Sequence, residues 1–211
     1  MDIQKDLIEY GKKMVAHGLT FNAGGNLSVR CDGGMIITPS GMDYELIESE
    51  DLCRYAEASG DFSGERVPSS EWQLHAAIYE KRRDIHAIVH THSPYIGVLS
   101  TLREELPPIH YLIASAGVSR VPVAGYATYG TRELAQEAVS ALGEMARAVI
   151  LSNHGLIACG KSLEEAYSSA RNLEFCAFLY IQALQTGKKP VLLTEGEMEE
   201  MFEKSKSYGQ K

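Results

Sequence analysis

The chain has 211 residues, of which 45% are hydrophobic and 23% are charged, and its formal net charge at pH 7 is −8. This length and composition are typical of one globular domain, which we expect to span residues 1–211. The acidic balance argues against a nucleic-acid partner and against an anionic membrane surface, because both require a basic patch.

The first third of the chain predicts one helix and two hairpins. Apolar residues recur at helical spacing in the first 17 residues, and Gly18 ends that pattern. Glycine-containing turns then separate short runs of strand-forming residues. The predicted elements are a helix over 2–17, a glycine-rich loop over 20–26, a hairpin with strands 27–30 and 35–38, and a second hairpin around 60–64.

The remaining sequence alternates helices with strands. Ser69 or Ser70 is the predicted N-cap of a helix that ends near Lys81. Ser162 and Glu165 have the spacing of a capping box at the start of a long helix. The other predicted elements are a strand over 87–92, a helix beginning at 93–94, an apolar segment over 109–116 that fits either strand or helix, an edge strand over 121–123, a helix over 131–143, a hairpin with strands 148–151 and 156–159, the long helix ending at 185, and a short helix beginning at 194.

These elements indicate an α/β fold. Hairpins require antiparallel pairing, so we expect a mixed sheet with helices on its faces rather than a doubly wound parallel sheet. No G-x-G-x-x-G follows the first strand and no P-loop is present, so the sequence gives no support for nucleotide binding.

The cysteines and the absence of targeting signals predict a cytoplasmic protein. No C-x-x-C pair occurs among Cys31, Cys53, Cys159 and Cys176, so we expect reduced thiols and no thiolate metal site. The N-terminus lacks a basic segment followed by an apolar core. No apolar stretch approaches the roughly 20 residues of a membrane helix, so we expect no membrane partner.

The segment His90-Thr91-His92 directly follows the apolar run 87–89. Because alternate side chains of a strand share a face, both imidazoles would emerge side by side at the end of this strand. Two convergent nitrogen donors form half of a divalent-metal site. The alternative is two unrelated surface histidines.

Two other segments favour the metal site. His154 follows a second apolar run, 148–151, and Glu71 lies where the helix after Ser70 begins. Three histidines and one carboxylate fit a catalytic site that leaves room for substrate and binds Zn²⁺, Mn²⁺, Fe²⁺ or Co²⁺. Glu71 is either a general base beside the metal or an acid that interacts favourably with the helix dipole.

Three segments offer weak signals for phosphate binding. Ser69 and Ser70 provide hydroxyls and the amides of a helix start, and the turns 24–26 and 40–41 can expose backbone N–H groups. As alternatives, the serines are caps and the glycines only form turns. Next to one cluster of candidate metal ligands, the three signals for phosphate binding are stronger together than each is alone.

The other histidines fit structural roles. His17 lies at a helix C-terminus, where a positive charge is favourable. His75 falls inside a helix and His86 just before a strand. His110 is a weaker candidate for a metal ligand, and its neighbour Tyr111 is the stronger functional candidate of the two.

Six segments occur in an order and spacing that carry a family resemblance. They are Gly24-Gly25-Asn26-Leu27-Ser28, Ile37-Thr38-Pro39-Ser40-Gly41, Pro68-Ser69-Ser70-Glu71, His90-Thr91-His92, Tyr126-Ala127-Thr128-Tyr129-Gly130 and Asn153-His154-Gly155-Leu156. Across essentially its whole length the chain resembles the class II aldolases, and the L-fuculose-1-phosphate aldolases are the most similar members. The resemblance implies a three-layer α/β/α fold on a mainly antiparallel sheet, and a homotetramer with active sites at subunit interfaces.

The resemblance also implies roles for single residues. Each subunit would hold one divalent metal ion, usually zinc, with Mn or Co as alternatives. The implied ligands are His90, His92, His154 and, when substrate is absent, Glu71. The implied phosphate-binding residues are Asn26, Ser40, Gly41, Ser69 and Ser70. Ser40 stands where the fuculose enzymes tend to have Thr, which keeps the hydroxyl.

Two catalytic residues and the aldehyde end of the site follow from the same resemblance. Glu71 would exchange a proton with the substrate carbon. Tyr111, contributed by a neighbouring subunit, would handle the proton at the aldehyde oxygen. Tyr129 is expected near the aldehyde, where the fuculose enzymes tend to have Phe. We expect the tail from about residue 206, which contains Tyr208, to be flexible or to close over the site.

The implied activity is a lyase reaction. A ketose 1-phosphate would be cleaved reversibly to dihydroxyacetone phosphate and a short aldehyde, without a lysine Schiff base. The substrate is L-fuculose 1-phosphate, which yields L-lactaldehyde, or 5-deoxyribulose 1-phosphate, which yields acetaldehyde.

Three related functions are alternatives. Pentulose-5-phosphate 4-epimerases have Asp in place of Glu71, whereas methylthioribulose-1-phosphate dehydratases share the metal ligands and a Glu. An adducin-like binding domain is the non-enzymatic alternative, and such a domain has no need for Glu71 together with three histidines.

Overall fold

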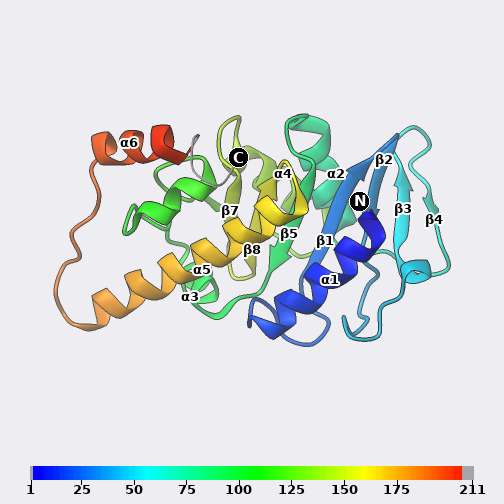
Figure 1. Ribbon diagram of the computed structural model, residues 1–211, viewed down its shortest axis with the longest axis horizontal. Helices are drawn as coiled ribbons and strands as arrows, with labels where there is room; N and C mark the ends of the chain where they lie inside the picture. The colour runs from blue at the N-terminus through cyan, green and yellow to red at the C-terminus, as the bar shows by residue number, and fades with distance from the viewer. Residues whose placement is uncertain (1, 206–211) are drawn as a thin grey trace.

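The computed structural model describes residues 2–205, which form three layers around one eight-stranded sheet (Figure 1). Across the sheet the strands follow the order β4-β3-β2-β1-β5-β8-β7-β6. Their bounds are β1 (Asn26–Cys31), β2 (Gly34–Ile37), β3 (Cys53–Ala56), β4 (Phe62–Ser63), β5 (Ala87–Thr91), β6 (Val123–Ala124), β7 (Ala148–Leu151) and β8 (Gly155–Gly160). In this part of the chain, every neighbouring pair is antiparallel except β6 and β7. The predicted mixed, mainly antiparallel sheet is confirmed.

Six α-helices and two short 3-10 helices complete the described fold. They are α1 (Ile3–Ala16), η1 (Ser49–Asp51), α2 (Trp72–Lys81), α3 (Pro94–Leu102), η2 (Tyr111–Ala116), α4 (Arg132–Leu142), α5 (Leu163–Gln185) and α6 (Glu195–Ser205). Between residues 2 and 205, no helix combines the length and the apolar character needed to cross a membrane. The predicted tail with Tyr208 lies outside the described residues.

Residues of β5 show how the sheet separates two hydrophobic cores. Ala87 and Val89 pack in the core shared with α1, α3 and α5, whereas Ile88 packs in the core shared with α2 and α4. All five residues of β5 are buried, as expected for a central strand covered on both faces. Figure 1 shows α5 crossing the front of the sheet, with α2 and α4 behind it. The implied α/β/α layering is therefore confirmed.

Local signals define several helix starts. The Asp2 carboxylate accepts hydrogen bonds from the first turn of α1, and Thr131 Oγ1 accepts one from the Leu134 N–H at 3.2 Å. Pro94 occupies the first turn of α3, where its missing N–H costs least. Ser162 Oγ caps α5 by accepting from the Glu165 N–H at 3.1 Å. These four helices begin where the sequence predicts.

The start of α2 differs from the prediction. The helix begins at Trp72, so Glu71 occupies the N-cap position and neither Ser69 nor Ser70 does. Ser69 Oγ instead accepts a hydrogen bond from the Glu71 N–H at 3.3 Å. The preceding residue Pro68 forms a β-bridge with Pro39, which holds this segment extended and delays the helix.

Three further predictions need correction. Phe62 belongs to a strand and not to a turn, because it pairs with Tyr55 between β4 and β3. Its ring also packs against those of Tyr55 and Trp72, with centroids 5.1 and 5.2 Å away. The predicted strand 121–123 shifts to β6, which runs parallel to β7. In the capping box, the Glu165 carboxylate accepts from the Lys161 N–H and not from the N-cap N–H. The ambiguous segment 109–116 contains the 3-10 helix η2.

Two glycines let the chain approach β5 closely. A Cβ atom on Gly25 would lie 2.4 Å from the His90 carbonyl oxygen, and one on Gly155 would lie 2.2 Å from the Thr91 carbonyl oxygen. Both distances are far below van der Waals contact, so neither position accepts a side chain without a backbone shift. The predicted metal ligands lie beside these two contacts.

We expect Gly155→Ala to lower the free energy of unfolding by about 1–3 kcal/mol, because its methyl group would push β8 away from β5. Gly97→Ala is the matched control, since a Cβ there meets no atom within 4 Å and Gly97 is helical. Alanine is about 1 kcal/mol more favourable than glycine in a helix, so the control should keep or gain stability. Thermal or urea unfolding measures both, and equal stability of the two variants would contradict the steric argument.

Candidate metal centre

The structure brings the four predicted ligands together at one end of the sheet. Glu71, His90, His92 and His154 each offer one ligand atom, and these atoms all lie within 4.8 Å of one another. His90 is on β5 and His92 follows directly, whereas His154 lies in the turn between β7 and β8. Glu71 comes from the start of α2. Segments far apart in the sequence thus meet at one point.

His90 lies at the centre of the cluster. Its Nε2 atom is 2.9 Å from His92 Nε2, 3.3 Å from His154 Nε2 and 3.0 Å from Glu71 Oε2. The second carboxylate oxygen, Glu71 Oε1, is 3.5 Å from His154 Nε2. Three ring nitrogens and a carboxylate therefore converge with little space between them.

The outer contact of His90 fixes its orientation. His90 Nδ1 lies 3.0 Å from the carbonyl oxygen of Leu156 on β8. Because a carbonyl can only accept, Nδ1 carries a hydrogen, and Nε2 faces the other ligand atoms, to which it offers a lone pair whenever the ring is neutral. A ligating histidine typically has this arrangement, in which the second nitrogen donates to a backbone carbonyl.

Charge in the cluster is concentrated on one carboxylate. Burial opposes ionisation of Glu71, but the charge and hydrogen bond of His90, the charge of His154 and the Asn26 amide together lower the pKa of this carboxyl below its usual range. For His90, burial favours the neutral form, and the Glu71 carboxylate outweighs it and raises the pKa of the ring. The protonated His90 ring thus places a positive charge beside the buried Glu71 carboxylate. A divalent cation can replace the proton as the source of this positive charge.

The other two imidazoles are neutral near pH 7. Burial, followed by the charges of His90 and His154, lowers the pKa of His92 to about 3. Burial and the charge of His90 lower the pKa of His154 to about 4. Neutral imidazole is the form that binds metal, and Glu71 Oε1 is buried with no hydrogen-bond partner among the described residues. The donor set and this unpaired oxygen fit a divalent cation.

A cleft of about 350 Å³ adjoins the cluster. It is lined by three of the four ligands together with every residue predicted to bind phosphate or the aldehyde end. These lining residues are Asn26, Ser40, Gly41, Ser69, Ser70, Glu71, His92, Tyr129 and His154. The segments Ser40–Gly41 and Ser69–Ser70, which we call the two serine turns, thus lie beside the ligands, as substrate binding would require.

A short backbone pairing aligns the two serine turns. Ser40 N–H donates to the Val67 carbonyl at 2.9 Å, and Ser69 N–H donates to the Thr38 carbonyl at 3.1 Å, on either side of the Pro39–Pro68 bridge. These two N–H groups are therefore engaged within the protein. The hydroxyl groups of the same serines stay available as donors to an anion in the cleft.

Asn26 has a contact that the sequence did not indicate. The side chain is 4% exposed, and its Nδ2 donates to Glu71 Oε2 at 3.0 Å. A residue predicted to bind phosphate is thus hydrogen-bonded to a predicted metal ligand. The signal available in the sequence was its position next to Gly25, which says nothing about this partner.

Tyr111 lies apart from the cleft within this chain. It begins η2, is 49% exposed and does not line the cleft. Its ring stacks on that of His110, with centroids 4.4 Å apart. Tyr129 is also exposed but borders the cleft.

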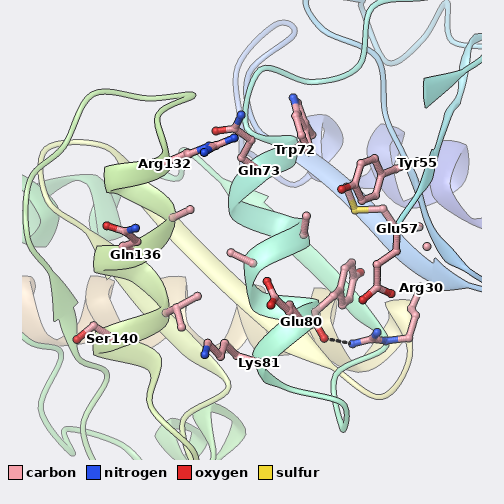
Figure 2. Close-up of a pocket in the computed structure, with 17 residues that line it drawn as sticks. Arg30, Tyr55, Glu57, Trp72, Gln73, Glu80, Lys81, Arg132, Gln136 and Ser140 are labelled. Atoms are coloured by element: carbon pink, nitrogen blue, oxygen red, sulfur yellow. Dashed lines mark hydrogen bonds between the residues drawn. The ribbon is translucent and has the colours of Figure 1, made fainter. Parts of the chain in front are cut away.

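A larger groove of about 750 Å³ lies between α2 and α4 and contains none of the predicted site residues. Figure 2 shows its wall, with Trp72, Gln73 and Arg132 at one end and Arg30, whose Nη2 donates to the Tyr79 carbonyl at 2.7 Å, at the other. The smaller cleft, and not this groove, is lined by predicted metal ligands.

Sequence reasoning missed one residue that holds the His92 segment. The Glu174 carboxylate on α5 accepts from Ser93 Oγ at 2.7 Å and from the backbone N–H groups of Tyr95 and Ile96, both at 2.9 Å. It thereby caps α3, which begins two residues after His92. A cap supplied by a distant helix leaves no local sequence pattern.

Comparisons with known proteins agree with this geometry. Residues 5–181 match the family model described as Class II Aldolase and Adducin N-terminal domain. The 5-deoxy-D-ribulose 1-phosphate aldolase of Bacillus thuringiensis serovar kurstaki is 44% identical over 209 residues, which cover 98% of this chain and 97% of that protein. The L-fuculose phosphate aldolase of Escherichia coli (strain K12) is 38% identical over 207 residues, which cover 98% of this chain and 95% of that protein.

A solved structure gives the same result. An L-fuculose 1-phosphate aldolase superposes with a TM-score of 0.92 at 47% identity, covering 97% of this chain and 96% of that chain. Family match, relatives and fold coincide over nearly the whole length. The chain therefore belongs to the class II aldolase and adducin N-terminal domain family, and it is a metal-dependent aldolase, a carbon–carbon lyase.

Proposed function

We propose that the protein cleaves a deoxyketose 1-phosphate, either L-fuculose 1-phosphate or 5-deoxyribulose 1-phosphate, to dihydroxyacetone phosphate and a short aldehyde. The observation that carries this proposal is the cleft in which Glu71 and two histidine ligands face the serine turns. A phosphate group and a reacting carbon could occupy its two parts at once. The named relatives act on these same two sugars.

One divalent metal ion per subunit belongs to this proposal. His90, His92 and His154 would hold it, with Glu71 as a fourth ligand when substrate is absent. A site of three neutral imidazoles and one carboxylate suits Zn²⁺, which we propose as the resident ion, with Mn²⁺ or Co²⁺ as substitutes. What a bound ion supplies is Lewis acidity, which stabilises the negative charge left on the ketone fragment when the carbon–carbon bond breaks.

Phosphate binding falls to the rim of the cleft. We assign the substrate phosphate to Asn26, Ser40, Gly41, Ser69 and Ser70. The hydroxyls of the two serine turns are uncharged donors, so an anion can bind without a basic patch, in keeping with the net charge of −8. Tyr129 would then face the aldehyde end of the substrate.

Proton movements follow from the reaction. Breaking the bond between C3 and C4 requires the C4 hydroxyl to lose a proton as it becomes the aldehyde, and C3 to gain one. We assign Tyr111 of a neighbouring subunit as the group that accepts the first proton and Glu71 as the group that supplies the second. This assignment requires an oligomer with interfacial sites, and the family resemblance favours a homotetramer. The half-exposed ring of Tyr111 supports it.

A cytoplasmic location completes the proposal. All four cysteines are free thiols, and three of them are buried. Free cysteines are typical of a reducing compartment.

The activity test is a coupled assay for dihydroxyacetone phosphate with each sugar phosphate. We expect cleavage that stops after chelation and returns with Zn²⁺, and a loss of bound metal in His92→Ala. L-Lactaldehyde or acetaldehyde among the products identifies the substrate. Borohydride should trap no covalent adduct, because no lysine Schiff base forms. A trapped lysine adduct, or full activity after verified metal removal, would falsify the metal mechanism.

We expect Glu71→Gln to reduce kcat by about 10²–10⁴-fold, because a positioned acid–base group typically contributes that much. The amide keeps the shape of the side chain but cannot exchange the proton. Metal content must be measured in the same preparation, so that loss of a ligand is distinguished from loss of the acid. Undiminished turnover with bound metal would reduce Glu71 to a ligand and helix terminus.

Subunit mixing tests Tyr111. We expect Tyr111→Phe and His92→Ala to be inactive separately and to recover partial activity when mixed, because some interfaces then combine an intact metal site with an intact tyrosine. Mass spectrometry verifies subunit exchange, and a mixture of unexchanged parents serves as control. Exchange without recovery would show that Tyr111 serves its own subunit or only packs.

A further inference from the structure

The buried face of α2 that meets the sheet contains a row of polar side chains beside its apolar ones. Glu71, His75 and Tyr79 follow one another at four-residue intervals, so they lie in one row along the helix. They are 5%, 0% and 4% exposed. Asn26 and Ser28 face this row from β1, two residues apart and therefore on the same side of the strand.

Hydrogen bonds join the two rows. Asn26 Nδ2 donates to Glu71 Oε2 at 3.0 Å, which links the first pair. Ser28 Oγ lies 2.7 Å from His75 Nδ1 and 2.8 Å from the Tyr79 hydroxyl. The Tyr79 hydroxyl also donates to the Ser28 carbonyl at 3.1 Å. Hydrogen bonds thus join β1 to α2 from the N-cap residue Glu71 to Tyr79.

β1 connects this helix to the metal centre. In the antiparallel register Asn26 is opposite His90, and Ser28 is opposite Ile88. The strand therefore carries hydrogen bonds to α2 on its side chains and backbone pairing to β5 along its edge. The position of Glu71 relative to His90 therefore depends on how α2 packs against β1.

His75 does not belong in this place for stability alone. It is fully buried, and its Nε2 atom has no hydrogen-bond partner in the described part of the chain. An unpaired buried polar atom is unfavourable, whereas apolar residues such as Leu74 and Ile78 fill the core beside it. A leucine at this position would fit the surrounding core without that cost.

We propose that Ser28 and His75 are positioning residues. They fix how α2 packs against β1 and thereby orient the Glu71 carboxylate toward the metal centre. This inference rests on the proposed metal site. Glu71 needs such support because it occupies the N-cap position of α2 without forming a side-chain cap. Among residues 2–205, only the Asn26 amide and the imidazoles of His90 and His154 contact its carboxylate directly. One helical turn after Glu71, the contact between Ser28 and His75 fixes the rotation of α2 about its axis. The direction of the Glu71 side chain depends on that rotation.

The test measures Zn²⁺ affinity of the metal-free protein by competition with a chelator. We expect Ser28→Ala and His75→Leu to bind Zn²⁺ about 10-fold more weakly, the lower end of the effect of outer-shell changes. The melting temperature of metal-free His75→Leu should stay within about 4 °C of wild type, because a leucine leaves no unpaired polar atom. Ser169→Ala is the matched control, since it removes another buried serine hydroxyl, which donates to the Ser115 carbonyl in the opposite core. Its Zn²⁺ affinity should not change.

A double-mutant cycle shows whether the effect passes through Glu71. In a Glu71→Ala background, His75→Leu should cause no further loss of Zn²⁺ affinity. A full 10-fold loss there, or unchanged affinity of both variants in the wild-type background, overturns the positioning role while leaving the metal site intact. Failure of the wild-type protein to bind one Zn²⁺ per chain overturns the proposed function, and this inference with it.

Discussion

The pairing register of β1, β5 and β8 is the constraint on which the site depends. His90 is opposite Asn26 on one side and Ile157 on the other, so its ring shares the side of the sheet that α2 covers. A slip of one residue would turn that ring to the opposite face and bring Thr91 into its place. Because β5 is apolar and buried on both faces, hydrophobic alternation alone does not fix this register. The bond from His90 Nδ1 to the Leu156 carbonyl occurs only in the observed one.

The electrostatics of the cluster explain why a buried carboxylate is tolerated there. Isolated in a protein core, an ionised Glu71 would be strongly unfavourable. Around it the fold places the Asn26 amide, the His90 ring and the His154 ring within 3.5 Å. The anion is therefore compensated by donors that are themselves held by the sheet and by the β7–β8 turn. The two imidazoles among these donors offer lone pairs to a cation when they are neutral, so one arrangement of the rings serves both states.

Much of this fold was predictable because its signals are local. The caps Asp2, Thr131 and Ser162 mark helix starts in the sequence itself, and the H-x-H spacing places two rings on one side of a strand. The apolar run before His154 and the helix start at Glu71 indicated the other two ligands, and the resemblance implied the same set. The contacts of Glu174 with α3 and of Asn26 with Glu71 were not predictable, because each joins residues 45 or more positions apart. The role proposed for Tyr111 involves a second copy of the chain, so no pattern within one chain locates its partners.

The start of α2 shows how function and local stability conflict in this structure. Serine is a better N-cap than glutamate, and two serines precede Glu71 in the sequence, so capping preferences alone favour an earlier helix start. The fold instead keeps Ser69 in an extended segment bridged to the 38–40 turn, where its hydroxyl reaches the cleft. Glu71 then takes the N-cap position but directs its carboxylate to the imidazoles, leaving the first-turn amides of α2 without a side-chain acceptor. A cap contributes about 1 kcal/mol, and its absence at this helix is the expected consequence of turning the Glu71 carboxylate toward the imidazoles. Local rules therefore failed at the point where the chain departs from them to bring Glu71 beside three imidazoles.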